Sequence, residues 1–309
     1  MSNDLRPILI AGPTASGKSA LALALAERFN GVIINADSMQ VYRELRILTA
    51  RPTSEDLARA PHRLYGFVPA SDAYSTGRYV KDVSVALQEA RDSGQRAIIV
   101  GGTGLYFKAL LEGLSPIPEI PVDVRQHWRD QEAREGAYAL WTVLMHDDPE
   151  MALRLEPNDG QRIVRALEVF HATGRSLAEF QRTPGTPILD NALAIKLLMM
   201  PSREELRARA DARFEQMLVQ GALAEAEALA ALKLDPALPA MRAIGVAPLV
   251  AAARGELSLA AATERAKAET RQYVKRQSTW LNKNMITWNT VCAQSMESSE
   301  PSAITFIQS

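Results

Sequence analysis

The first third of the chain alternates short apolar runs with stretches of helical periodicity. The runs have the length and β-branched content of buried strands, and they cover residues 7–11, 31–37 and 96–100. The helical stretches that follow them cover residues 19–29, 79–93 and 105–114. Strands that alternate with helices predict an α/β fold, in which helices cover both faces of a parallel sheet.

The pattern changes after residue 114. Three prolines fall within residues 115–121, which marks a boundary. Helical patterns follow near residues 122–133, 136–145, 149–155 and 159–173. An apolar run at 192–200 predicts a return to the sheet. The remaining pattern predicts a long helix over 202–232, helices near 240–254 and 258–281, and a last strand at 285–290.

This pattern predicts a discontinuous α/β core with an inserted all-α module. Residues 1–114 and 192–292 form the core with its C-terminal helices, and residues 115–191 form the module. Residues 293–309 form a serine-rich tail that we expect to fray. Open parallel sheets bind ligands at the carboxyl ends of their strands, so the residues that follow each strand are the first candidates for a site.

Composition excludes several classes of protein. The 309 residues are 47% hydrophobic and 23% charged with a net charge of −1, which suits a globular protein and gives no global sign of a nucleic-acid partner. One cysteine allows no internal disulfide and no cysteine-based zinc site. No apolar run reaches the roughly 18 residues of a membrane helix, and the N-terminus lacks the form of a signal peptide. We therefore expect a cytoplasmic protein.

The strongest motif follows the first predicted strand. The stretch GPTASGKS matches G-x-x-x-x-G-K-[ST] at every fixed position, and a strand and a helix flank it as the motif requires. Loop N–H groups and the helix N-terminus favour an anion, Lys18 adds positive charge, and the Ser19 hydroxyl can ligate Mg²⁺. The alternative is a glycine turn without a ligand. We expect a phosphate-loop NTPase-like fold whose polyphosphate site comprises Gly12, Pro13, Thr14, Ala15, Ser16, Gly17, Lys18 and Ser19.

Two further stretches lie at strand ends. Asp37, in NADSMQ, could help to hold Mg²⁺ or accept a proton from a nucleophile, or it could cap the following turn. Ser38 and Gln40 offer side-chain hydrogen bonds suited to base edges. Thr103, in VGGTGLY, could bond a phosphate oxygen or orient a base, or it could cap the helix that follows. The three strand ends together predict one site.

Two segments suit contacts with nucleic acid. In the module, Gln161 and Arg165 share a helix face next to Arg162, a combination suited to bases and phosphates, although an ordinary solvated face is the alternative. Residues 265–283 carry six basic side chains and one acid, with two interleaved aromatics. Such a strip suits a phosphate backbone, and its alternative is a basic surface helix. Arg209 and Arg213 are candidates for a diphosphate contact on the long helix.

These stretches together resemble the tRNA dimethylallyltransferases, also called tRNA isopentenyltransferases. The resemblance runs in the family's order from residue 12 to about 280. It rests on GPTASGKS, NADSMQVYR, TARPT, the YS of DAYSTGRYV, VGGTGLYFKALLEGLSPIP, DGQRIVRALEVFHATGRSL, MRAIGV and TRQYVKRQSTW. Eukaryotic relatives add a zinc finger, for which this chain has neither the length nor the cysteines, so the resemblance implies a bacterial type.

The resemblance implies transfer of a dimethylallyl group from dimethylallyl diphosphate to the exocyclic amine of the adenosine that is 3′-adjacent to the anticodon. Lys18, the loop amides and Mg²⁺ would stabilise the diphosphate, Asp37 would accept the amine proton, and Thr103 would stabilise the bridging region of the donor or its leaving oxygen. The same loop could also hold a nucleotide such as ATP. We expect a monomer whose partner is the tRNA anticodon stem-loop.

The resemblance also implies a set of RNA contacts. It assigns contacts with tRNA to Asp37, Ser38, Met39, Gln40, Thr103, Gln161, Arg162, Ile163, Val164, Arg165, Arg242, Arg271, Lys275 and Arg276. Val246 and Asn282 depart from the family pattern, which affects details of RNA contact. Two other readings remain open: a small-molecule or nucleoside kinase that uses Asp37 as its base, and an RNA-binding NTPase module without a product.

Overall fold

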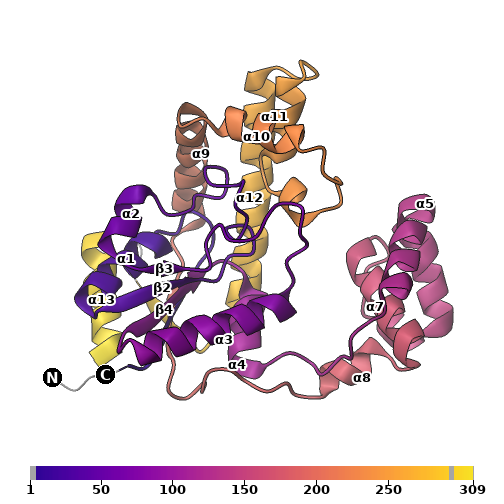
Figure 1. The fold of residues 1–309 in the computed structure, drawn as a ribbon, viewed down its shortest axis with the longest axis horizontal. Helices are drawn as coiled ribbons and strands as arrows, with labels where there is room; N and C mark the ends of the chain where they lie inside the picture. Colours follow the sequence, from indigo (N-terminus) through magenta and orange to yellow (C-terminus); the bar gives the residue numbers. More distant parts are fainter. Residues whose placement is uncertain (1–4, 292–295, 309) are drawn as a thin grey trace. The chain divides into compact units, whose positions relative to one another are not determined.

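A six-stranded parallel sheet organises the larger part of the chain (Figure 1). Its order is β3-β2-β4-β1-β5-β6, and every pairing is parallel. The strands are β1 (Ile8–Ala11), β2 (Gly31–Asn35), β3 (His62–Arg63), β4 (Arg96–Gly101), β5 (Ile195–Met199) and β6 (Asn289–Val291). The predicted fold class is confirmed, although the sequence pattern did not indicate β3.

The structure is a computed structural model that describes residues 5–291 and 296–308. Contacts divide the chain into two units, which we call the core and the module. The core comprises the residues up to Leu111 together with those from Ile188 onward, and the module comprises Glu112–Pro187. The sequence predicted an inserted module at 115–191.

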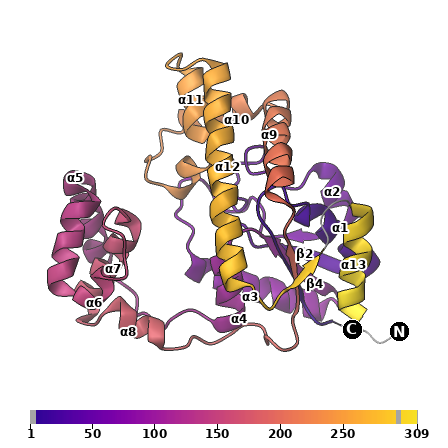
Figure 2. The same cartoon turned by 180° about the vertical axis from the view of Figure 1, so that it is seen from behind.

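Alternating side chains of the strands fill two separate hydrophobic clusters, one on each face of the sheet. Leu9 and Ile99 pack on one face, towards α3 (Thr76–Asp92), α4 (Gly104–Glu112) and α12 (Leu259–Asn284). Ile8 and Ile98 pack on the other face, where α1 (Lys18–Arg28) and α13 (Met296–Gln308) lie (Figure 2). Burial on both faces explains why the strands read as continuous apolar runs.

Glycine breaks two helices that the sequence pattern joined. The expected helix over 202–232 is α9 (Arg203–Val219) followed by α10 (Ala222–Ala231), because Gly221 has a φ of 104°, which other residues rarely adopt. Gly245, with a φ of 88°, likewise separates the 3₁₀ helix η1 (Pro239–Arg242) from α11 (Val246–Ala253). The pattern also missed the short helix α2 (Ser54–Arg59).

The expectation of a frayed tail is wrong for residues 296–308, which form α13. Ala303 and Ile307 are almost fully buried in the cluster that also contains Leu21 and Leu25 of α1. This burial supplies the hydrophobic stabilisation that a serine-rich composition did not suggest. The remaining tail residues, 293–295 and 309, lie outside the described residues.

The module is a set of helices around its own hydrophobic cluster. The helices are α5 (Val122–Asp147), α6 (Pro149–Ala152), α7 (Gly160–Thr173) and α8 (Leu177–Arg182). Gly136, with a φ of 80°, interrupts α5 close to the predicted break between 133 and 136. Trp128 and Leu140 from the two halves of α5 share the cluster with Ile163 and Leu167 of α7.

Candidate active site

The loop between β1 and α1 forms an anion cradle at the carboxyl edge of the sheet. Ala15 and Gly17 have left-handed backbones, with φ of 66° and 90°. A Cβ at Gly12 would lie 2.6 Å from Ser16 Oγ and 2.8 Å from the Met199 carbonyl oxygen, so only glycine fits there. Ser16 Oγ is buried and finds no hydrogen-bond partner in the described part of the chain. A ligand oxygen would satisfy it.

Lys18 lies buried in this cradle, and among residues 5–291 and 296–308 no carboxylate is hydrogen-bonded to it. Its Nζ donates to the Pro13 carbonyl oxygen at 3.2 Å. Burial lowers the pKa of Lys18 from 10.5 to about 8; the charge of Asp37 opposes this shift and Arg213 adds to it. A desolvated cation beside the unpartnered Ser16 hydroxyl is an arrangement that favours a bound anion.

Asp37 is fixed by the residues around it. The buried side chain of Asn35 accepts from the Asp37 N–H at 2.8 Å and donates to the Asp37 carbonyl oxygen at 2.9 Å. Asp37 Oδ1 accepts from the Met39 N–H at 2.9 Å, which is the turn cap that the sequence left open as an alternative. Oδ2 makes no hydrogen bond among the described residues, so the carboxylate caps the turn and still offers one oxygen.

Thr103 links the turn after β4 to the segment after β2. Its Oγ1 accepts from the Ser38 N–H at 3.0 Å and donates to Ser38 Oγ at 3.3 Å, and its own N–H donates to the Ala36 carbonyl oxygen at 3.2 Å. The hydroxyl therefore bonds to Ser38 instead of capping α4. The carboxyl ends of β2 and β4 are thus tied together, as the sequence predicted for a shared site.

Gln277 of α12 is a site residue that the sequence analysis missed. Its Oε1 accepts from the Thr14 N–H at 2.9 Å, and its Nε2 donates to the Gly102 carbonyl oxygen at 3.1 Å. The side chain is buried, with 6% of its surface exposed. It therefore joins the anion cradle to the turn that carries Thr103. The sequence did contain a sign of this role, because Gln277 is a polar residue in a helical stripe that also contains the apolar Val274 and Leu281.

A cavity of about 290 Å³ opens beside the cradle. Thr14, Asp37 and Arg213 contribute polar groups to its lining. The apolar lining comprises Met39, Leu48, Phe214, Met217 and Ile244. A cavity that combines a carboxylate, a cation and apolar side chains suits a ligand with one charged and one apolar part.

Arg213, not Arg209, reaches this cavity. Burial lowers the pKa of Arg213, and the charge of Asp37 opposes that shift, so the two groups share one electrostatic environment with Lys18. Arg209 lies 3.5 Å from Glu205 and does not line the cavity. Of the two candidates on α9, the geometry favours Arg213 for an anion.

The core residues that we expect to contact RNA occupy different environments. Ser38, Met39, Arg242 and Arg276 line the cavity, and Lys275 is exposed on α12. By contrast, the side chain of Gln40 is already hydrogen-bonded, because its Nε2 donates to the Thr49 carbonyl oxygen at 2.8 Å.

Arg271 neither lines the cavity nor is fully exposed. Its Nη1 donates to both carboxylate oxygens of Asp211, at 3.0 and 2.9 Å, and the side chain is half-buried. Because this guanidinium is already paired and only partly exposed, the geometry does not favour the expected contact between Arg271 and RNA phosphates, which stays a prediction.

In the module, exposure separates the predicted contacts in the same way. Gln161 and Arg162 are exposed; Arg162 lies 3.4 Å from Asp159, and Arg165 lies 3.1 Å from Glu168. Ile163 and Val164 are buried in the hydrophobic cluster of the module, so the expectation that their side chains contact RNA needs correction. The helical period agrees with this, because Ile163 and Val164 share a helix face with Leu167, which is also in the cluster.

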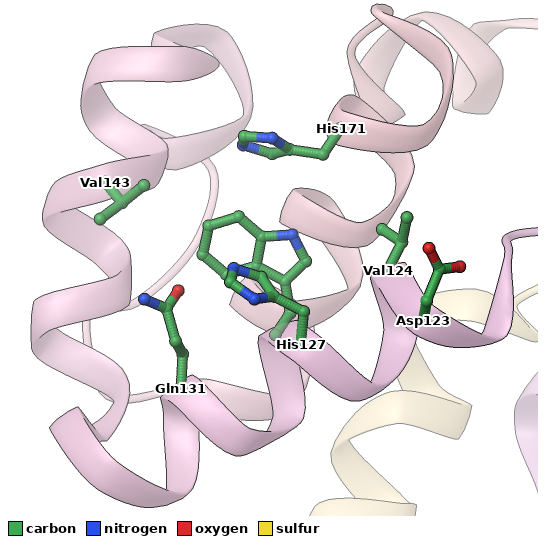
Figure 3. Close-up of a pocket in the computed structure, with 7 residues that line it drawn as sticks. Asp123, Val124, His127, Gln131, Val143 and His171 are labelled. Carbon is green, nitrogen blue, oxygen red and sulfur yellow. The ribbon is translucent and has the colours of Figure 1, made fainter.

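The module also has a larger hollow of about 740 Å³ between α5 and α7 (Figure 3). Its lining includes Asp123, His127, Gln131 and His171, but neither lysine nor arginine. His171 Nε2 is 2.8 Å from Asp147 Oδ2. The smaller cavity of the core holds the reactive groups, so we assign the active site there despite the difference in volume.

The described residues bear on metal binding and on membrane insertion. Over residues 5–291 and 296–308, histidine, cysteine and acidic side chains form no cluster of three that could hold a metal ion. In the same ranges, none of the helices combines the length and the apolar character that a membrane crossing requires. Ser19 is exposed at the start of α1, next to Lys18.

The glycine loop between β1 and α1 of a parallel sheet defines a protein of the phosphate-loop NTPase-like class. The family described as IPP transferase matches residues 40–284, and the family described as isopentenyl transferase matches residues 6–71. The chain belongs to the IPP transferase family, which confirms the resemblance found in its sequence.

Curated relatives and crystal structures agree with this assignment. The chain is 50% identical over 302 residues to the tRNA dimethylallyltransferase of Parvibaculum lavamentivorans, covering 98% of this chain and 96% of that one. It is 53% identical over 285 residues to that of Agrobacterium fabrum, covering 92% and 96%.

The similarity extends to crystal structures. The full-length tRNA isopentenylpyrophosphate transferase of Bacillus halodurans superposes with a TM-score of 0.70 at 29% identity, covering 98% of this chain and 96% of that chain. A eukaryotic dimethylallyltransferase, described as acting on tRNA, gives a TM-score of 0.80 at 27% identity, with 97% and 76% covered.

Proposed function

We propose that the chain transfers a dimethylallyl group from dimethylallyl diphosphate to the exocyclic amine of the adenosine 3′-adjacent to the anticodon of tRNA, with release of diphosphate. The observation that supports this most directly is the cavity of about 290 Å³, where the carboxylate of Asp37 and the guanidinium of Arg213 meet an apolar lining beside the phosphate loop. Membership of the IPP transferase family supports the same reaction.

The cradle holds the diphosphate of the donor. Loop N–H groups, Ser16 Oγ, Lys18 and Arg213 surround the position where negative charge develops as the allylic C–O bond breaks. Donors and cations fixed in a desolvated site stabilise that charge without reorganisation. The apolar lining, with Leu48, Phe214 and Met217, suits the five-carbon chain.

Mg²⁺ fits this site as an ion shared between protein and substrate. The Ser19 hydroxyl is exposed next to Lys18, and the described residues supply no three-ligand cluster, which suits an ion that keeps waters and binds substrate phosphates. Ser19 would hold it, and it would supply positive charge to the departing diphosphate.

Asp37 acts on the acceptor. A new C–N bond forms between the allylic carbon and the adenine amine, the amine loses a proton to Asp37 Oδ2, and the electrons of the broken C–O bond leave with diphosphate. The adenine amine is a weak nucleophile, so a fixed base at this position contributes to the rate. The base must leave its stack to enter the cavity, which is easier in a single-stranded loop.

Surface cations bind the RNA. Arg242, Lys275 and Arg276 lie exposed around the cavity and on α12, and Gln161, Arg162 and Arg165 lie on α7 of the module. Contacts of this kind with phosphates release counterions and give salt-dependent affinity. The proposal further includes a monomeric enzyme that acts in the cytoplasm.

One assay tests the proposal against both alternatives. The protein is incubated with Mg²⁺, labelled dimethylallyl diphosphate and unmodified tRNA, and the label in tRNA is mapped to a nucleotide. We expect label on the adenosine 3′-adjacent to the anticodon. Phosphoryl transfer from ATP to a small acceptor, without labelled tRNA, would establish a kinase. Binding of RNA with ATP hydrolysis and no labelled product would establish an NTPase module.

A further inference from the structure

Glu225 of α10 makes a contact that neither the catalytic site nor the RNA surface explains. Its carboxylate accepts from three consecutive backbone N–H groups of a segment about 180 residues earlier in the chain. Oε2 accepts from Arg46 at 2.8 Å and from Ile47 at 2.7 Å, and Oε1 accepts from Leu48 at 2.9 Å. Consecutive N–H groups that converge in this way form a concave anion site, and here the anion is a side chain.

The segment that Glu225 holds forms part of the cavity wall. Residues 46–50 lie between β2 and α2 and form neither helix nor strand. Leu48 and Thr49 line the same cavity as Asp37. A Cβ at Gly245 would lie 3.1 Å from Leu48 Cδ2 and 3.0 Å from Phe214 Cε2, so Leu48 packs closely against the backbone at Gly245, beside Phe214.

Other hydrogen bonds also hold the wall, mostly through its carbonyl oxygens and the Thr49 side chain. Gln40 Nε2 donates to the Thr49 carbonyl oxygen at 2.8 Å, and Thr49 Oγ1 donates to the Leu45 carbonyl oxygen at 2.6 Å. Within the segment, the Ala50 N–H donates to the Ile47 carbonyl oxygen at 2.9 Å, whereas the three N–H groups of residues 46–48 have their acceptor outside it, in Glu225. Glu225 itself does not line the cavity, so any effect on the ligand must pass through the segment.

We propose that Glu225 is a positioning residue that holds Leu48 and Thr49 against the dimethylallyl chain of the donor, and so determines donor affinity. The inference rests on the proposed function of the cavity. Charge-assisted bonds to three N–H groups keep the wall in one conformation before the donor binds, which lowers the entropic cost of ordering it.

The test compares Glu225→Gln with Glu227→Gln, a matched change on the same helix. Glu227 is exposed and has no hydrogen bond or ion pair among the described residues. In Glu225→Gln an amide NH₂ replaces one acceptor oxygen and faces N–H groups. We expect the donor KM to rise about tenfold, the equivalent of roughly one lost hydrogen bond, with little change in the KM for tRNA or in kcat. Glu227→Gln should behave as wild type.

A double-mutant cycle with Leu48→Ala separates positioning from a general loss of stability. If Glu225 acts through the wall, Glu225→Gln adds little to the effect of Leu48→Ala on donor affinity, so the two changes are not additive. Fully additive effects, or a Glu225→Gln variant with an unchanged donor KM, would overturn the inference. An equal loss in the KM for both substrates would overturn it as well, because that result indicates a merely structural role.

Donor binding is also measured directly, by calorimetry with dimethylallyl diphosphate in the absence of tRNA. If wild type binds the donor but labels no tRNA, the proposed function fails while the affinity comparison still tests Glu225. If wild type labels tRNA and Glu225→Gln binds donor as tightly as Glu227→Gln, only the inference fails.

Discussion

The site in the core and the outer face of α7 in the module hold their polar residues in opposite ways. In the core, side chains far apart in sequence meet through buried hydrogen bonds: Gln277 bonds to Thr14 across 263 positions, and Asn35 fixes Asp37. In the module, Arg162 and Arg165 pair with carboxylates three residues away on their own helix. Such short-range pairs on a helix surface are weak.

This difference indicates which part of the molecule determines turnover and which part contributes to tRNA affinity. The geometry of the cavity in the core is set by the fold before any ligand binds, which is the condition for electrostatic stabilisation of a transition state. The cations of the module are neutralised locally and must exchange a carboxylate for an RNA phosphate. Changes in the core should therefore affect turnover strongly, and changes in the module should affect tRNA affinity weakly.

The largest effect is expected from Asp37→Asn. Asn keeps an oxygen for the Met39 N–H, so the turn stays capped, but it cannot accept the amine proton. We expect kcat to fall about 10²- to 10⁴-fold, the usual contribution of a general base, with donor affinity nearly unchanged. Single-turnover transfer of label to tRNA measures it. A near-normal kcat in this variant would show that Asp37 is not the base that the fold of the core positions for the reaction.

The second prediction concerns Lys18 and the pH dependence of donor affinity. Because burial lowers its pKa to about 8, Lys18 is protonated below that value and loses its charge as the pH rises through it. Donor affinity should therefore fall about tenfold from pH 7 to pH 9 in wild type. Lys18→Arg, whose guanidinium stays charged, should remove this dependence. Calorimetric titration across the pH range provides the measurement, and an identical profile in both proteins would contradict the assignment.

The third prediction concerns Gln277→Met. It removes both bonds that join the cradle to the turn of Thr103, leaving a buried N–H and a buried carbonyl without partners. We expect kcat to fall about 10- to 100-fold through misplacement of the reacting groups, and the free energy of unfolding to fall by about 1–3 kcal/mol. Gln272→Met, on the exposed side of the same helix, is the control and should change neither.

The sequence predicted most of the core site because strand ends and a phosphate loop are local signals. Lys18, Asp37 and Thr103 all follow predicted strands, and parallel strands bring their ends together. The roles of Gln277, Arg213 and Glu225 in the site depend on which helix face packs against which loop. In a single sequence, the sign of such packing is a polar residue within an apolar stripe. Arg213 and Gln277 both occupy such stripes, next to Ala210 and Val274.

The sequence predicted the surface residues less well, because charge alone does not reveal pairing. Arg271 belongs to the basic strip of α12, but Asp211 of α9 neutralises it. Ile163 and Val164 were assigned as RNA contacts from the motif around them, whereas their place in the helical period puts them in the cluster of the module. Backbone breaks at Gly221 and Gly245 were missed, since glycine inside a helical pattern is ambiguous.

A smaller effect is expected from Lys275→Ala on α12. This exposed lysine should contribute one phosphate contact, so its loss should weaken tRNA binding about threefold and lower the salt dependence by about one unit of slope. Arg271→Ala is the contrasting variant: it removes an ion pair with Asp211, so thermal stability should fall and the salt slope should stay unchanged. Equal salt slopes for both variants would remove the distinction between exposed and paired cations on α12.

The smallest effects should come from the module, where the comparison can be tested in both directions. Arg162→Ala removes an exposed cation, so tRNA affinity should fall about two- to threefold. Asp159→Asn keeps an N-cap residue for the Arg162 N–H and removes the carboxylate that neutralises its guanidinium, so affinity should rise by a similar factor. Binding of labelled tRNA at two salt concentrations measures both changes. If both variants bind as wild type does, this face of α7 does not meet RNA; if both bind more weakly, the carboxylate orients the arginine instead of competing with phosphate.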